Sequence, residues 1–153
     1  MTKYIKNILF IGLVLLGLIS CDNTLKYENH KPMNIRVKGN SDTLDKVQKL
    51  FNEQNYELAN VHLSRMAHYY SNNEEIQLYY AITFLETDQY ALAKIKFEKL
   101  LLSTNATFVN DAKWYLALMA FKQNDLTTCK TYLEQIPEDA SIYKKTKSLL
   151  KNI

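Results

Sequence analysis

Three stretches of the chain repeat one pattern of polar, aromatic and small residues. Asn55–Ala59, Gln89–Ala93 and Asp125–Cys129 align with one another at offsets of 34 and 36 residues. Each stretch ends on a small residue, and a large apolar residue follows four positions later. These large residues are Leu63, Phe97 and Leu133. A period near 34 residues is typical of arrays of helical hairpins, because one hairpin cannot bury its apolar face alone.

The pattern predicts two antiparallel helices per unit, joined by short polar turns at residues 52–55, 86–89 and 122–125. Polar stretches at 72–73 and 103–105, and then Pro137, separate the units, with Asn and Ser as helix caps. The chain has only three Gly and two Pro, a scarcity that helices tolerate better than sheets do. We therefore expect an all-α domain over residues 42–153.

A last helix is expected over Glu138–Asn152. Its apolar stripe consists of Ile142, Tyr143, Thr146, Leu149, Leu150 and Ile153. Its other face carries Lys144, Lys145, Lys147 and Lys151. One apolar and one charged face suit a helix that caps a stack of repeats. A basic amphipathic helix also suits an anionic membrane surface.

The N-terminal residues have the pattern of an export signal. Lys3 and Lys6 precede an apolar run over Ile8–Ile19, which as a helix spans about 18 Å and falls short of the roughly 30 Å hydrocarbon core. Leu18–Cys21 resembles the lipobox of bacterial lipoproteins. That resemblance implies a signal peptide over residues 1–20, cleavage before Cys21, and lipidation of Cys21. The alternatives are an ordinary signal peptide with an incidental Cys and a buried N-terminal helix.

Residues 21–41 are expected to form the lipidated Cys and a polar tether with no helical apolar period. Within the tether, Met33–Val37 is expected either to form a short strand or to lie along the domain. Removing residues 1–20 takes away two lysines, so the formal net charge falls from +3 to +1. The charge therefore gives no reason to expect a nucleic-acid partner.

The repeated pattern resembles the tetratricopeptide repeat (TPR), whose signature is W-x2-L-G-x2-Y, then A-x3-F, then P. Ala93-x3-Phe97 matches the second half outright, and Ala59-x3-Leu63 and Cys129-x3-Leu133 match it in kind. The chain departs from the signature in lacking the Trp at the first position and the Gly after the Leu. The resemblance implies about three TPR-like hairpins and a C-terminal capping helix, stacked as a short right-handed solenoid.

In the TPR family, fixed positions on the first helix of each repeat line an inner groove that binds proteins. In this chain, the positions corresponding to that groove include Leu44 and Gln48. The candidate protein-binding residues are Phe51, Leu78, Ile82, Leu85, Trp114, Leu118 and Phe121. Such an apolar, aromatic groove suits an extended or helical segment. Alternatively, in so short an array these residues belong to the core or lie under the segment 22–41.

No motif in the sequence favours an enzyme. His62 and His68 are six residues apart, so on a helix they point to different faces, which disfavours zinc ligation. Cys129 occupies a small-residue position of the repeat, as expected of a buried, inert thiol. There is no glycine-rich phosphate loop. We therefore expect no catalytic, cofactor-binding or metal-ligating residues.

The leading interpretation is a lipid-anchored scaffold or adaptor of the bacterial cell envelope that binds another protein through its repeats. The lipid anchors it in the inner or the outer membrane, and a periplasm-facing position is favoured over a surface-exposed one. The run Lys113–Leu118, followed by Tyr143-x-Lys145 and Leu149-Leu150, is similar to repeat lipoproteins of Bacteroidota envelopes. One alternative is an envelope module that binds a small ligand or lipid in the apolar groove. Another is a regulatory partner of an envelope sensor.

The lipobox resemblance predicts that Cys21→Ala abolishes both acyl labelling and membrane retention, because two or three acyl chains are needed for stable anchoring. Metabolic labelling with a fatty acid and membrane fractionation measure the two effects. Cys129→Ala is the matched control and is expected to leave both unchanged. Labelling and retention that survive Cys21→Ala would show that the Cys is incidental.

Overall fold

The computed structural model describes residues 30–36 and 41–153, and within them it is helical, with no strand. The described helices are α1 (Ser41–Asn52), α2 (Tyr56–Tyr69), α3 (Glu74–Glu86), α4 (Tyr90–Leu100), α5 (Ala106–Lys122), α6 (Leu126–Glu134) and α7 (Tyr143–Leu150). The predicted signal peptide, Cys21 and the first part of the tether lie outside the described residues. Among those described, no helix combines the length and apolar character needed to cross a bilayer.

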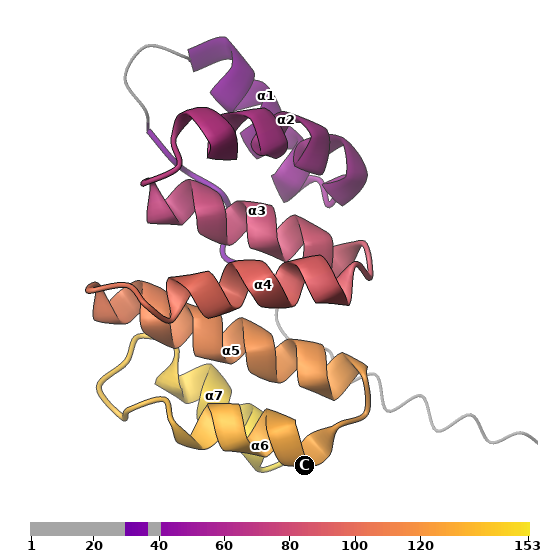
Figure 1. Cartoon of the computed structure of the whole chain (residues 1–153). Coiled ribbons are helices and arrows are strands. Elements are labelled where there is room, and N and C mark those ends of the chain that lie inside the picture. Colours follow the sequence, from indigo (N-terminus) through magenta and orange to yellow (C-terminus); the bar gives the residue numbers. More distant parts are fainter. Residues whose placement is uncertain (1–29, 37–40) are drawn as a thin grey trace, which may run out of the picture.

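Each helix packs against the next one along the chain, and α3 also contacts α5. Figure 1 shows the result, a stack that runs from α1 and α2 at one end to α6 and α7 at the other. The contacts are therefore mostly between neighbours in the sequence, as expected of helical hairpins that follow one another.

The three predicted turns within the hairpins share one backbone geometry. Gln54, Asp88 and Asn124 have φ angles of 61°, 56° and 60°, and they are again 34 and 36 residues apart. The residue after each donates its N–H to a carbonyl five positions back: Asn55 to Leu50 (2.9 Å), Gln89 to Phe84 (2.8 Å) and Asp125 to Ala120 (2.9 Å). Such bonds satisfy carbonyls that a helix end otherwise leaves unpaired. The internal repeat is thus present in the turns as well as in the sequence.

Side-chain caps begin most of the helices that follow a turn. Asn73 accepts a hydrogen bond from the N–H of Ile76 (3.0 Å), and Asn105 from that of Thr107 (3.0 Å). Asp125 accepts from the N–H of Thr128 (3.0 Å), and this bonding lowers the pKa of its carboxyl. The predicted separators at 72–73 and 103–105 therefore contain the caps of α3 and α5.

The repeated small and large residues form the core between hairpins. Ala59, Ala93, Cys129, Leu63, Phe97 and Leu133 are all fully buried. Small residues at these positions allow neighbouring helices to approach closely, and the large ones fill the space between them. Burial, with a smaller contribution from Asp125, raises the pKa of the Cys129 thiol to about 11, which fits the predicted inert role.

The last helix is shorter than predicted. It begins at Tyr143 rather than Glu138, because the preceding residues form successive tight turns. Ala140 donates its N–H to the carbonyl of Pro137 (3.1 Å), and Tyr143 donates to that of Ala140 (2.9 Å). The predicted apolar stripe is nevertheless correct where α7 exists, since Thr146 and Leu149 are buried. The helix packs against α6 at the end of the stack.

Gln54→Gly is expected to stabilise the protein by about 0.5–1 kcal/mol, because glycine adopts a positive φ without the steric cost that a side chain brings. Urea unfolding followed by circular dichroism measures the change. The matched control is Gln123→Gly, at an exposed position with φ −87°. There the added freedom of the unfolded chain should destabilise the protein, so equal effects of the two variants would contradict the prediction.

Candidate functional site

Residues His30–Arg36, here called the strap, form an extended segment that lies along the helices (Figure 1). Met33 and Ile35 are each only 2% exposed, whereas their neighbours in the strap point to solvent. Of the two expectations for Met33–Val37, the described part, up to Arg36, follows the second and lies along the domain. Val37 lies outside the described residues.

Side chains of α1 and α3 bind the main chain of the strap. The amide of Asn52 makes two hydrogen bonds with Met33, accepting from its N–H (2.8 Å) and donating to its carbonyl (3.2 Å). Gln48 accepts from the N–H of Ile35 (2.6 Å). The hydroxyl of Tyr79 donates to the carbonyl of Pro32 (3.1 Å). The helices therefore hold an extended backbone through polar side chains, while the strap's alternate side chains enter the core.

His30 joins the strap to the C-terminal ends of α3 and α5. Its Nε2 lies 3.2 Å from Oε1 of Glu86, whose other oxygen is 3.1 Å from Nζ of Lys122. The imidazole also packs among aromatic rings, with centroid distances of 5.4 Å to Tyr115 and 5.9 Å to Tyr56. Its ring centroid also lies 6.2 Å from that of Phe51, so one residue of the strap contacts side chains from four helices.

The Glu86 carboxylate is stabilised by these two basic partners. Burial by itself raises its pKa, but the hydrogen bonds and charges of His30 and Lys122 outweigh that effect. The pKa of Glu86 is therefore below its ordinary value. A carboxylate with a lowered pKa in the folded state stabilises the fold only while it is ionised.

Most of the predicted groove residues are buried. Phe51, Leu78, Ile82, Leu85, Trp114 and Leu118 are at most 8% exposed, and Phe121 is half-buried. These six buried residues all belong to the core, and Phe121 packs against it, as the alternative interpretation expected. Gln48, at a position that the TPR resemblance assigns to the groove, accepts a hydrogen bond from the strap. Leu78, Ile82 and Trp114 line a pocket.

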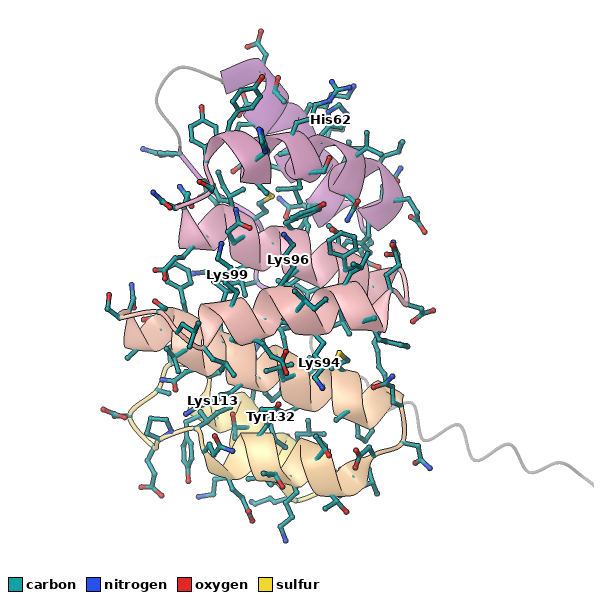
Figure 2. All side chains as sticks on the ribbon, viewed as in Figure 1. His62, Lys94, Lys96, Lys99, Lys113 and Tyr132 are labelled. Carbon is teal, nitrogen blue, oxygen red and sulfur yellow. The ribbon has the colours of Figure 1, made fainter. Side chains whose placement is uncertain are left out.

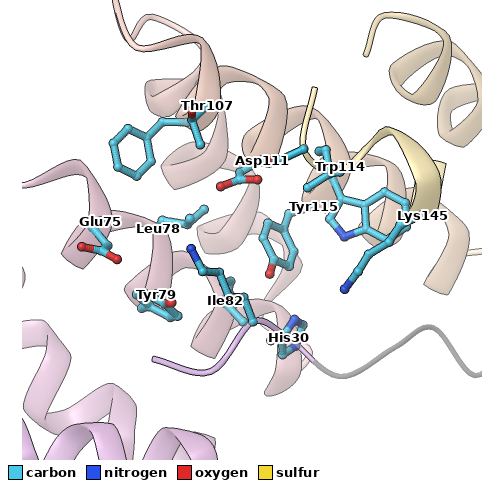
Figure 3. A pocket seen from close by; sticks show the side chains of 14 residues that line it. His30, Glu75, Leu78, Tyr79, Ile82, Thr107, Asp111, Trp114, Tyr115 and Lys145 are labelled. Carbon is cyan, nitrogen blue, oxygen red and sulfur yellow. The ribbon is translucent and has the colours of Figure 1, made fainter. Parts of the chain in front are cut away.

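The pocket has a volume of about 260 Å³ and lies between α3, α5 and the turn before α7 (Figure 3). His30 and Lys31 of the strap form part of its wall. The hairpin stack and the strap thus enclose it together. It lies on the same helical face, beside the first residues of the strap.

Polar groups also line the pocket. Burial raises the pKa of the Asp111 carboxyl, and the nearby Lys31 only partly offsets this. Burial, with smaller effects of Glu75 and Asp111, raises the pKa of Tyr79 to about 12. Burial also raises the pKa of Tyr115 well above its ordinary value. The pocket thus combines apolar walls with polar groups that face the same space, and binding sites use such polar groups to orient a ligand.

Sequence reasoning missed Asp111, Tyr115 and Asn52. Asp111 precedes Trp114 by three residues and so lies on the same side of α5, a spacing that pointed to it. The role of Asn52 carried no such signal, because it depends on a segment 19 residues away. Among the described residues, no group of three or more His, Cys, Asp or Glu side chains is placed to bind a metal ion.

The second helices of the hairpins present a different surface. Leu58 and Val61 on α2, and Leu92 and Ile95 on α4, are each at least 45% exposed. Figure 2 shows Lys94, Lys96 and Lys99 along α4 on the same side of the molecule. This face is apolar and basic, and it contains none of the candidate groove residues.

Asn52→Ala is expected to increase hydrogen exchange of the Met33 amide about tenfold, because the N–H loses its acceptor. Amide exchange measured by NMR gives the rate at each strap residue. Asn72→Ala, at an exposed position on the turn before α3, is the matched control and should leave the rate unchanged. An unaltered Met33 rate in Asn52→Ala would mean that other contacts hold the strap.

Glu86→Gln is expected to make stability less sensitive to acid. The lowered pKa of Glu86 means that its carboxylate contributes stability above the ordinary pKa of 4.5, and that this contribution is lost as the pH falls further. Urea unfolding at pH 6 and pH 3 should show a larger loss for the wild type than for the variant. Glu98→Gln, in an exposed pair with Lys94, should behave as the wild type does. Equal losses in all three proteins would exclude Glu86 as the source.

No family model, curated protein or solved structure matches this chain. The features that bear on function are therefore the strap, the pocket and the repeated hairpins.

Proposed function

We propose that this protein is a lipid-anchored scaffold of the bacterial cell envelope that binds another protein through TPR-like repeats. In this proposal Cys21 carries the lipid, and the helices form a short right-handed solenoid of three hairpins capped by α7. A periplasm-facing position is favoured over a surface-exposed one. The protein is not an enzyme in this proposal and needs no cofactor.

The regular spacing of the hairpins supports the repeat part of the proposal. The turn residues with positive φ, the fully buried small residues and the fully buried large residues all recur at 34 and 36 residues. A recurrence of local geometry, burial and sequence at one period is expected when each unit packs in the same way on its neighbour.

The observation that carries the binding part is the way α1 and α3 hold the strap. Asn52, Gln48 and Tyr79 bind its backbone, while Met33 and Ile35 fill apolar space. Extended peptides are commonly recognised by main-chain hydrogen bonds together with pockets for alternate side chains. The same face continues past the strap into the open pocket, where a partner's segment has both apolar and polar groups to contact.

A second candidate is an envelope module that binds a small ligand or lipid in the same pocket. The enclosure of the pocket by aromatic residues favours it. Its volume of about 260 Å³ is below the range of roughly 300–1,000 Å³ that is usual for small-molecule sites. A single side chain of a partner protein fits that volume better than a lipid chain does.

Site-specific photo-crosslinking in the organism that encodes the protein tests the proposal. A photoreactive amino acid replaces Thr107, an exposed residue at the edge of the pocket. We expect one discrete crosslinked protein, which mass spectrometry identifies. The matched control carries the same group at Thr127, an exposed residue of α6, and should give no such product.

Purification of the full chain in mild detergent separates the two candidates. A stoichiometric protein that matches the Thr107 crosslink supports the scaffold. A bound lipid or small molecule, with no protein partner and no crosslink, contradicts it and supports the second candidate.

A further inference from the structure

Among the polar groups that line the pocket, the carboxylate of Asp111 and the hydroxyl of Tyr115 make no hydrogen bond within the described residues. Tyr115 is only 7% exposed, and Asp111 is half-buried. Every fully enclosed side-chain polar atom described has a partner, so these two groups keep access to the pocket. Figure 3 shows both residues on α5, with the Asp111 carboxylate turned toward Leu78 and Glu75 of α3.

A half-buried carboxylate without a hydrogen-bond donor is unfavourable. Burial raises the pKa of Asp111, and the charge of Lys31 does not fully compensate. Lys31 lines the pocket but is exposed, so water screens its charge. The negative charge of Asp111 is therefore not fully balanced within the pocket, and a cationic hydrogen-bond donor would balance it.

The positive groups of the wall do not supply that donor. Lys145 is half-buried, and Figure 3 shows its amine on the Trp114 side of the pocket, apart from the Asp111 carboxylate. His30 is paired with Glu86 (3.2 Å). Glu75 adds a second carboxylate to the Asp111 side, so this side favours a cation over an anion.

Apolar and aromatic side chains form another part of the wall, among them Leu78, Ile82, Phe108 and Trp114. Aromatic rings bind the planar guanidinium group well, and carboxylates accept its donors in pairs. The volume of about 260 Å³ accommodates one long side chain and little more. A compact ammonium group matches this combination less well than a guanidinium does.

We propose that the pocket binds an arginine side chain of the partner protein, with Asp111 as its carboxylate acceptor and Tyr115 as an additional hydrogen-bonding group. This rests on the proposed function, because it assumes that the ligand is a protein segment. The arginine lies beside the strap, and its stem contacts Leu78 and Ile82. The pocket thus selects partner segments by charge and shape, whereas the α1–α3 part of the face is already occupied by the strap.

The full chain in detergent micelles is titrated with N-acetyl-arginine amide and with its neutral isostere, N-acetyl-citrulline amide. Trp114 is the only tryptophan of the chain and lines the pocket, so its indole N–H signal in NMR reports binding there. We expect the arginine compound to bind at least tenfold more tightly than the citrulline compound. N-acetyl-lysine amide is expected to bind more weakly than the arginine compound.

Asp111→Asn keeps the shape of the side chain and removes its charge, so it should abolish the preference for arginine over citrulline. Asp45→Asn, at an exposed position of α1, is the matched control and should retain it. Equal binding of the arginine and citrulline compounds to the wild type overturns the proposal without any variant. Equal binding of the arginine and lysine compounds also overturns it. A preference for arginine over citrulline that survives in Asp111→Asn overturns it as well.

The titration tests the arginine site, and the Thr107 crosslink tests the proposed function, so either proposal can fail without the other. A Thr107 crosslink to a protein, with no arginine preference, would leave the scaffold in place and remove the arginine site. An arginine preference without any crosslinked protein would retain the site and contradict the scaffold.

Discussion

The pairing of the strap's main chain with the amides of Asn52 and Gln48 is the interaction on which the rest of the helical face depends. Burying Met33 and Ile35 brings their N–H groups out of water, and each of these needs an acceptor. Inside a helix the backbone N–H and C=O groups already bond to one another, so side chains have to provide the acceptors for the strap. With the strap held in this way, His30 reaches Glu86 and Tyr115, and the wall of the pocket is complete.

The strap and the pocket therefore divide one helical face into two parts. Along α1 and the adjoining part of α3, the strap of the same chain covers the face. At α3 and α5, the face carries the pocket, which Trp114 and Asp111 line. The polar side chains of the two parts also differ. Asn52 and Gln48 are neutral amides, which suit the binding of a peptide backbone, whereas Asp111 is a charged acceptor, which suits the binding of a basic side chain. Binding in the second part does not require that the strap leave the first.

The hairpins were predictable from the sequence because their determinants are local. The turn at Gln54 and the burial of Phe97 follow from residues within one or two helical turns. The start of α7 was predicted too early, since the stripe from Ile142 onward says nothing about the turns that Pro137 and Ala140 form. The groove prediction mixed two sets of residues, because Leu118 in the core and Trp114 at the pocket have the same helical spacing. That Met33–Val37 lies along the domain was one of two expectations, but its partners were beyond prediction, as Met33 and Asn52 are brought together only by the tertiary fold.

The position of His30 changes the reach of the proposed membrane anchor. A fully extended chain from Cys21 to Ser41 spans at most about 70 Å, but the strap fixes the chain at His30, and from Cys21 to that point the limit is about 30 Å. Because His30 also lines the pocket, a lipid at Cys21 keeps the pocket within that distance of the bilayer surface. If the proposals hold, the tether restricts the partners to proteins whose arginine-bearing segment lies close to the membrane.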